Sequence, residues 1–405
     1  MLLSQRKANN MSVLTGLDVL LQNETELRQL RDRKIGILAH AASINRNAEH
    51  IFFLLKAKGL NIIRVFAPEH GLWAAAQDME GVDHGYDPII GQEVYSLYGH
   101  SLETLAPESG ALADLDTLII DLQDVGARYY TFIYSAWILT QCCLRARKTV
   151  YILDRPNPIG GEVLEGNVVH EGFHSFVSYM PLPTRHAMTI AELIYLWSDE
   201  YLNDEERQGL HLIRMEGWKR SMMFDETGLP WVMPSPNMPT LETAIVYPGQ
   251  CLLEGTLLSE GRGTTRPFEI FGAPWIKTGP TLEALRAFEL PGVVFRPLRF
   301  KPTFQKQAHQ LCNGFQLHVT DRNTFESVAT TVCILSVLIA LHPDDFAWRT
   351  EKYEFIEDIP AIDLLFGDNS IRTQLESHRN PIKIIEAMSA ERESFMPRRA
   401  AHLLY

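Results

Sequence analysis

The sequence has few cysteines and no long apolar run, and each shortage argues against a class of protein. Its 405 residues include five cysteines, an odd number with no C-x-x-C spacing, so neither a disulfide framework nor a zinc ribbon is indicated. The most apolar helical stretch, Thr330–Leu341, is shorter than the ~20 residues that a helix needs to cross a bilayer. Residues 1–10 lack the apolar core of a signal peptide, so we expect a cytoplasmic protein.

Basic residues are also in short supply, with 37 lysines and arginines against 50 aspartates and glutamates. The net charge of −13 argues against a nucleic-acid-binding protein, which needs a basic face, and against binding to an anionic membrane. An anionic substrate would therefore need arginines placed locally at its site. The apolar fraction of 46% is ordinary for a globular protein, and the length predicts two domains. No feature of the composition indicates an oligomeric state.

Several catalytic motifs are absent as well. No G-x-G-x-x-G follows the first expected strand, and neither a Walker A motif nor a G-x-S-x-G elbow occurs, which disfavours nucleotide binding and serine-hydrolase chemistry. One formal match exists, because residues 170–174 read H-E-x-x-H, the zinc-binding pattern of metalloproteases. That chemistry requires a helix, whereas Gly172, Pro181 and Pro183 predict an extended segment. We therefore expect no metal there.

The first half of the chain alternates between strand-like and helix-like patterns. Short apolar runs predict strands at Lys34–His40, Asn61–Phe66, Asp116–Asp121, Thr149–Leu153 and Leu210–Met215. Longer periodic segments predict helices at Ala48–Lys58, Tyr129–Arg147 and Thr189–Tyr201. This alternation predicts right-handed βαβ units and a mainly parallel sheet. Residues 71–110 form an excursion too long for a routine connection, so we expect it to be functional.

The second half differs in character. Residues 255–274 are rich in Gly, Thr and Pro, after which the pattern predicts strands at Val293–Phe300 and Gly314–Thr320 and a buried helix at Phe325–Leu341. The segment Glu391–Tyr405 is weakly patterned. We expect an α/β protein with one domain at residues 1–250 and a second, mixed α/β domain at residues 251–405.

Acidic residues follow three of the expected strands. Glu69 stands just after Asn61–Phe66, Asp121 and Asp124 end the third strand, and Asp154 follows the fourth. Ligands of open α/β sheets bind beyond the carboxyl ends of the strands. The sequence therefore predicts an acid-lined crevice and an enzyme that acts on a polar substrate.

Carboxylates in such a crevice suit glycoside hydrolysis, which needs an acid to protonate the leaving oxygen and usually a second carboxylate. Glu69 is the candidate acid, because the adjoining apolar strand would desolvate it. The alternative is a capping or ion-pairing role at a strand end. Asp121 and Asp124 are candidates for the second carboxylate, although Asp124 precedes a helix and would also serve as its N-cap. His70 would tune Glu69 or bind a sugar, or make a structural contact in its loop.

Ordered sequence blocks indicate a family. They are Pro68–Gly71, Tyr95–Gly99, Asp121–Thr131, Leu153–Gly161, Pro234–Thr240 and Ser259–Phe268. From about Gly16 onward the chain resembles the exo-β-N-acetylmuramidase family NamZ, also known as DUF1343. It departs from the family pattern at Leu72–Ala74, where Arg-Gly is common, and at His40, where Asn is common.

The resemblance implies a Rossmann-like domain and a smaller C-terminal domain with the active cleft between them. It implies the removal of terminal non-reducing N-acetylmuramic acid from small peptidoglycan saccharides or muropeptides, without a metal or organic cofactor. The family's catalytic glutamate falls on Glu69. With no export signal in view, we expect a cytoplasmic recycling enzyme. The expected substrate-binding residues are Tyr98, Arg128, Tyr129, Asp154, Asn157, Asn237, Glu260, Arg262 and Arg266.

Two of these expectations carry explicit alternatives. Arg262 and Arg266, in a Gly-rich loop, or Arg128 would pair with the lactyl carboxylate of the sugar, but an interdomain salt bridge explains such arginines equally well. Tyr98, Tyr129 and Tyr130 would stack on sugar rings, although aromatic residues more often belong to a core. Asp154, followed by Arg155, is alternatively one half of a structural ion pair.

The mechanism stays open between retaining, inverting and substrate-assisted courses, with Asp121 or Asp124 as the group that would orient the acetamido group in the last case. The competing function is a non-catalytic muropeptide-binding or sensor protein. A nucleotide-linked or phosphoryl-transfer enzyme is disfavoured, because the Gly-rich loop lacks the Lys-Ser/Thr pair.

Overall fold

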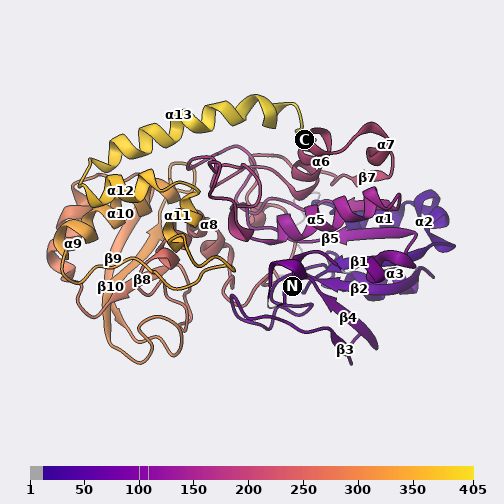
Figure 1. Ribbon diagram of the computed structural model, residues 1–405, viewed down its shortest axis with the longest axis horizontal. Coiled ribbons are helices and arrows are strands. Elements are labelled where there is room, and N and C mark those ends of the chain that lie inside the picture. Colours follow the sequence, from indigo (N-terminus) through magenta and orange to yellow (C-terminus); the bar gives the residue numbers. More distant parts are fainter. Residues whose placement is uncertain (1–11, 100, 108) are drawn as a thin grey trace, which may run out of the picture.

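The computed structural model describes residues 12–99, 101–107 and 109–405, so the prediction for residues 1–10 lies outside the described residues. Its N-terminal half is built on one large sheet (Figure 1). The strands of this sheet are β1 (Lys34–Ala39), β2 (Asn61–Ala67), β3 (Gly85–Asp87), β4 (Gln92–Ser96), β5 (Thr117–Asp121), β6 (Thr149–Leu153) and β7 (Leu210–Ile213). Every strand expected from the sequence of this half is present, within a few residues at its ends.

The sheet is mainly parallel, as predicted. Its order is β3-β4-β2-β1-β5-β6-β7, and only the β3–β4 pair is antiparallel. Apolar residues fill both faces because alternate side chains point in opposite directions. On β1, Ile35 and Ile37 belong to the core that also holds the helices near the N-terminus, whereas Leu38 belongs to the core on the other face.

Helices cover both faces, which makes the N-terminal half a doubly wound, Rossmann-like unit. One face carries α1 (Gly16–Gln22), α2 (Glu24–Arg31) and α3 (Ile51–Ala57). The other carries α5 (Phe132–Arg145) and α6 (Ile190–Tyr201). The remaining helices of this half are α4 (Ser109–Ala113), α7 (Asp204–Arg207) and α8 (Leu241–Gln250). Helix α8 ends at Gln250, and the domain boundary expected near that residue stays a prediction.

The strand order reverses direction between β1 and β5, the point at which doubly wound sheets usually bind ligands. Here that crevice is filled by the protein itself. The Ser43 hydroxyl donates to the backbone carbonyl of Asp121, and the backbone N–H of Gln123 donates to His40 Nε2 at 2.9 Å. A ligand therefore cannot occupy the usual position between β1 and β5. The available space lies one strand away, at the carboxyl end of β2.

The C-terminal half is smaller and mixes helices with a three-stranded antiparallel sheet, β8-β10-β9, as the predicted fold class requires. Its strands are β8 (Ile270–Ala273), β9 (Val293–Phe300) and β10 (Cys312–Val319). Its helices are α9 (Thr278–Arg286), α10 (Ser327–Leu341), α11 (Ala361–Phe366), α12 (Ser370–Glu376) and α13 (Pro381–Ala400). Helix α10 is buried on nearly all sides against α8 and α9, which confirms the predicted buried helix.

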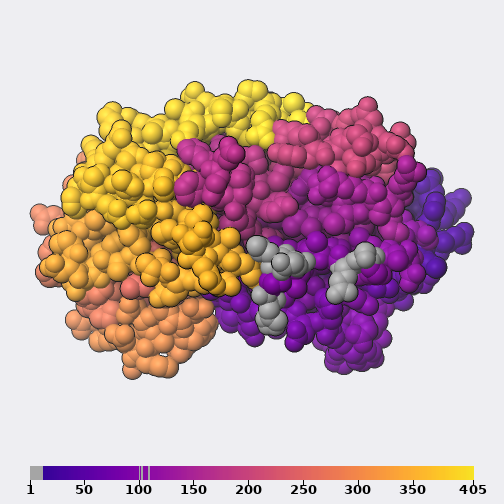
Figure 2. Space-filling view, in the orientation of Figure 1, coloured from indigo at the N-terminus to yellow at the C-terminus, as the bar shows by residue number. Residues whose placement is uncertain are grey.

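The weakly patterned C-terminal segment is a long helix that crosses the molecule. Helix α13 begins on the C-terminal half and runs along the top of Figure 1 to α6 of the N-terminal half. Figure 2 shows the same helix as a continuous band over both parts. Arg398 forms a two-pronged contact with Glu200, at 2.7 Å for each hydrogen bond, and Arg399 donates to the Ala187 carbonyl. The helix thus ties the two halves together.

Within the described part of the chain, no helix is both long and apolar enough to cross a membrane.

Candidate active site

A pocket lies where the carboxyl end of β2, the start of α5 and loops of the C-terminal half meet. Its total space is about 480 Å³, including the part open to solvent. The N-terminal half contributes Glu69, His70, Asp78 and the start of α5, and the C-terminal half contributes Glu254, Arg262, Phe268, Tyr353 and Glu354. Residues of both halves therefore line this pocket, and its lining is rich in carboxyl groups.

Glu69 lies on the pocket wall just beyond the last residue of β2. Pro68 ends the strand, and the chain then turns sharply through His70 and Gly71, whose φ angles are +70° and +78°. The Glu69 side chain is 5% exposed, and its Oε2 accepts a 2.6 Å hydrogen bond from the Thr131 hydroxyl at the start of α5. Among the described residues no lysine, arginine or histidine forms an ion pair with it.

His70 is oriented by its own loop. Its Nδ1 lies 2.9 Å from the Ala76 carbonyl oxygen, which can only accept, so Nδ1 donates this hydrogen bond. The residue belongs both to the pocket and to a neighbouring groove of about 1050 Å³ in total, which is lined by the excursion after β2. His70 therefore stands at the junction of the two spaces.

Glu354 faces the same pocket from the C-terminal half. It is 6% exposed, and its Oε2 accepts a 3.0 Å hydrogen bond from the Tyr98 hydroxyl across the boundary between the halves. Burial, and then the negative charge of Glu69, raises the pKa of Glu354 well above its ordinary range. Two carboxyls of one pocket thus act on each other.

Arg262 is the principal cation of the pocket, and it is already neutralised. Its Nη1 lies 2.9 Å from Asp78, its Nη2 lies 2.6 Å from Glu254, and its Nε lies 3.3 Å from Glu260. Although burial acts in the opposite direction, these three carboxylates raise the pKa of Arg262 well above its usual range. Asp78 belongs to the N-terminal half, so the interdomain salt bridge that the sequence left as an alternative is present.

Three further predicted residues line the pocket or adjoin it. Tyr129 and Tyr130 form part of the wall, and the Tyr129 hydroxyl donates to the Pro248 carbonyl at 2.8 Å. Asn237 also lines the pocket, where its amide donates to Gln77 at 2.8 Å. Their contact with a sugar stays a prediction.

Asp121 is not at the pocket, and its predicted catalytic role is corrected. The side chain is fully buried at the end of β5 and accepts hydrogen bonds from Arg155, one of them at 2.7 Å from Nη2. Burial raises the pKa of Asp121, and the Arg155 charge opposes that rise. Arg155 also donates to the Ile44 carbonyl at 2.8 Å. The group is a buried ion pair that closes the crevice between β1 and β5.

Asp124 lies behind the pocket wall and not on it. Its Oδ2 accepts a 2.7 Å hydrogen bond from the Gly126 N–H and lies 3.2 Å from His186 Nε2. The N-cap position of α5 is held by Thr131, so the alternative role of Asp124 as a helix cap is also wrong. Its buried Oδ1 has no partner within the described residues.

Arg128 and Asn157 serve the fold and not the pocket, which corrects their predicted roles. Arg128 is fully buried and donates to the carbonyls of Asn167, Leu182, Leu365 and Phe366 at 2.7–2.8 Å. Its cation therefore fastens the two halves together. Asn157 accepts from the Ile159 N–H and donates to the Met188 carbonyl.

Asp154 is likewise buried away from the pocket. It accepts hydrogen bonds from Thr189, from the Ala191 N–H and from the Tyr405 hydroxyl at 2.7, 3.0 and 2.8 Å. Burial raises the pKa of Asp154 to about 7. The alternative pairing with Arg155 is wrong too, because that arginine pairs with Asp121.

The predicted substrate contacts of Glu260, Arg266 and Tyr98 are also corrected. Glu260 is 2% exposed and neutralised by Lys306 at 2.7 Å and by Arg262. Arg266 is half-exposed, pairs with Glu269 and lines a different hollow. Tyr98 is 1% exposed, with its ring packed on Phe176, so it does not offer a face to a sugar.

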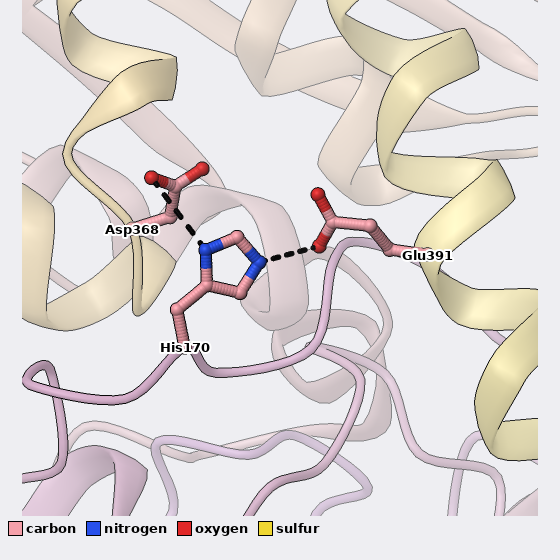
Figure 3. A group of neighbouring side chains, drawn as sticks. All are labelled: His170, Asp368 and Glu391. Carbon is pink, nitrogen blue, oxygen red and sulfur yellow. Dashed lines mark hydrogen bonds and ion pairs between the residues drawn. The ribbon is translucent and has the colours of Figure 1, made fainter.

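The H-E-x-x-H match lies in a segment without helix, as expected from its glycine and prolines. His170 instead stands between Asp368 and Glu391 (Figure 3), with Nε2 3.0 Å from Glu391 and Nδ1 3.9 Å from Asp368. The two carboxylates face different nitrogens of one ring. His170 thus joins its loop to the turn between α11 and α12 and to α13. One ligand atom from each of the three residues lies within 4.8 Å of the others, a spacing that could hold a metal ion, although His174 of the motif takes no part in it.

Sequence reasoning missed Asp78, Glu254, Tyr353 and Glu354. Asp78 lies in residues 71–110, the long excursion that was expected to be functional. The length of that excursion therefore indicated the right segment but not the residue. Glu354 follows α10 in an irregular segment, and nothing in its local pattern separates it from a surface acid. Its φ of +46° and that of Phe355, +70°, mark an unusual local conformation that only coordinates reveal.

Comparison with known proteins agrees with this geometry. Residues 35–242 match the family model "Exo-beta-N-acetylmuramidase NamZ, N-terminal", and residues 245–405 match its C-terminal counterpart. The chain belongs to the NamZ family. NamZ is a family of glycosidases, so the predicted membership and enzyme class are confirmed.

Individual relatives match nearly the whole of this chain. It is 39% identical over 399 residues to the peptidoglycan β-N-acetylmuramidase NamZ of Bacillus subtilis (strain 168), spanning 98% of this chain and 92% of that protein. Two crystal structures of DUF1343 family proteins from Bacteroides fragilis superpose with TM-scores of 0.87 and 0.73, at 28% and 25% identity. Each covers 97% of this chain and 99% of the other.

Proposed function

We propose that the protein is an exo-acting glycoside hydrolase that releases terminal, non-reducing N-acetylmuramic acid from peptidoglycan fragments. Membership of the NamZ family supports the reaction class, and the named activity of the Bacillus subtilis relative supports peptidoglycan as the source of the substrate. The site supports it through a pocket rich in carboxyl groups, which is the chemistry that glycoside hydrolysis requires.

Glu69 is the general acid in this proposal. The observation that carries it is a buried carboxyl on the pocket wall, held by the Thr131 hydroxyl and without an ion-pair partner in the described chain. A buried carboxyl on the wall of the pocket is placed where it can give a proton to the leaving oxygen of a bound sugar. The other strand-end acids, Asp121 and Asp154, are engaged in structural contacts.

The shape of the site suits removal of one terminal sugar. The pocket is small and enclosed by both halves, with room of about 40 Å³, whereas the groove beyond His70 has room of about 510 Å³. We place the glycosidic bond where the two spaces meet, beside Glu69 and His70, and the leaving sugar in the groove. The exposed ring of Tyr86, on the wall of the groove, offers a surface for a sugar ring.

The substrates are small saccharides or muropeptides in this proposal, and the protein serves the recycling of cell-wall fragments in the cytoplasm. A non-catalytic muropeptide-binding protein is the alternative. Membership of a glycosidase family favours the enzyme, and a binding protein has no need of a buried acid without a partner.

The test is hydrolysis of a chromogenic β-N-acetylmuramide beside the matching β-N-acetylglucosaminide. We expect release of the chromophore from the muramide and little from the glucosaminide. Binding of both without release from either would contradict the proposal and favour the binding protein.

A further inference from the structure

We propose that Asp78 occupies the place on Arg262 that the lactyl carboxylate of the muramic acid residue takes when the substrate binds. The exchange of one carboxylate for the other opens the pocket to the sugar, so Asp78 and Arg262 together select an anionic substrate. The proposal rests on the proposed function and deepens it, because it names the group of the substrate that the site recognises.

The pocket beside Glu69 is too small in this structure to hold a sugar residue. Its room of about 40 Å³ suits only a few water molecules, because each water needs ~10–15 Å³. Residues 75–82, here called the lid, separate it from the neighbouring groove, since Asp78 lines the pocket and Ala76 and Glu80 line the groove. Movement of the lid therefore joins the two spaces.

Polar contacts at its tip hold the lid in place. Asp78 accepts from Arg262 Nη1 at 2.9 Å and from the exposed Gln305 amide at 3.1 Å, and both donors belong to the C-terminal half. The neighbouring Gln77 accepts from the Asn237 amide at 2.8 Å. Of these contacts, the one with Arg262 joins two full charges. The ion pair is therefore the principal latch of the lid.

The rest of the lid is held weakly. No residue from 73 to 89 is fully buried, so less apolar packing holds this segment than holds the strands of the sheet. Ala74, just before the lid, and Met79, within it, have φ angles of +53° and +56°. Such angles are unfavourable for residues with a side chain and persist where surrounding contacts enforce them. The closed conformation therefore depends on the contacts at the tip.

Arg262 can release Asp78 and keep its other partners. Its Nη2 lies 2.6 Å from Glu254 and its Nε lies 3.3 Å from Glu260, which also pairs with Lys306 at 2.7 Å. All of these residues belong to the C-terminal half, and only Asp78 comes from the lid. A sugar carboxylate in its place restores both the charge of the cluster and the charge-assisted hydrogen bond. A neutral sugar breaks that bond and does not replace it.

Calorimetric titration with N-acetylmuramic acid and with its methyl ester tests the exchange, because the ester has nearly the same shape without the charge. On the wild-type protein we expect the acid to bind at least about tenfold more tightly than the ester, since only the acid replaces Asp78 on Arg262. Equal affinities for the acid and the ester would overturn the proposal.

Asp78→Asn tests the latch itself. The amide keeps an oxygen beside Arg262 but loses the charge, so the closed lid is less favoured. We expect both ligands to bind about tenfold more tightly, while the ratio of their affinities stays near that of the wild type. Asp114→Asn, the same change at a side chain 69% exposed, is the matched control and should leave both affinities unchanged. Unchanged or weaker binding by Asp78→Asn would contradict the exchange.

Gln305→Ala loosens the tip of the lid from the other side, at an exposed residue whose replacement does not disturb the core. Both ligands should again bind more tightly, by a smaller factor than in Asp78→Asn. A loss of affinity in this variant would also count against the latch.

These titrations measure binding and not turnover, so the two proposals fail separately. If the chromogenic muramide is not hydrolysed but the ligands bind as expected, the proposed function is wrong and the exchange stands. If the muramide is hydrolysed but the acid and the ester bind equally well, the exchange is wrong and the proposed function stands.

Discussion

At the scale of single residues, ion pairing decides which acids are available for chemistry. The sequence predicted four acids near strand ends, and Glu69 alone among them lines the pocket. Asp121 was an equally good candidate by its position on a strand, but Arg155, from the next strand, neutralises it. Whether a cation lies against an acid depends on tertiary contacts, which local sequence patterns do not encode. For the same reason the sequence missed Glu354.

The Asp121–Arg155 pair gives a prediction that separates structure from catalysis. Asp121→Asn leaves the buried guanidinium of Arg155 uncompensated, so we expect the free energy of unfolding to fall by about 3–5 kcal/mol. The kcat of the folded fraction should stay within a few-fold of the wild type, since Asp121 does not reach the pocket. Urea unfolding and active-site-normalised kinetics measure the two quantities. A large loss of kcat with unchanged stability would restore Asp121 as a catalytic residue.

At the scale of elements, the strands and helices of the sheet were predictable because each buries a regular face. Short apolar runs located β1, β2, β5 and β6, and a mostly apolar run located α10. Helix α13 was not predicted, because it crosses two halves and contacts each through a few residues. Its buried positions are sparse, so it shows no continuous apolar stripe. The loop that carries Glu354 has no repeating pattern of apolar residues, so the sequence does not predict its conformation.

Tyr405, which follows helix α13, gives a prediction that depends on pH. The Tyr405 hydroxyl donates to Asp154 and accepts from the Met215 N–H, both at 2.8 Å. We expect Tyr405→Phe to lower the free energy of unfolding by about 1–3 kcal/mol, because it leaves buried polar groups unsatisfied. Tyr201→Phe, at a side chain 47% exposed, is the control and should have little effect.

The sign of the pH effect follows from Asp154. Burial raises its pKa from 3.8 to about 7, so the folded state binds this proton between about pH 4 and pH 7 and the unfolded state does not. The stability contributed by that proton is present below about pH 4 and is lost as the pH rises toward 7. The Tyr405 hydrogen bond lowers this pKa, so its loss should cost more at about pH 8 than at about pH 5. Equal losses at both pH values in urea unfolding would contradict this account.

At the scale of the whole molecule, the site exists only where the two halves meet. The sequence predicted two halves, a parallel sheet in the first and a cleft between them. It did not predict that Asp78, Arg262 and Glu254 would form a single cluster across the boundary. In that cluster, Asp78 and Glu254 neutralise Arg262, one of the arginines that were expected to bind the lactyl group. Two carboxyls of the pocket, Glu69 and Glu354, one from each half, have no ion-pair partner among the described residues.

The central claim is that Glu69 delivers a proton to the leaving oxygen, and one comparison tests it most directly. Glu69→Gln is assayed on the natural type of disaccharide, whose leaving alcohol needs protonation, and on an aryl muramide whose acidic phenol leaves without it. We predict that kcat/KM falls by about 10²–10⁴ on the disaccharide and by less than about tenfold on the aryl muramide. Equal losses on both substrates, or no loss on the disaccharide, would contradict the account.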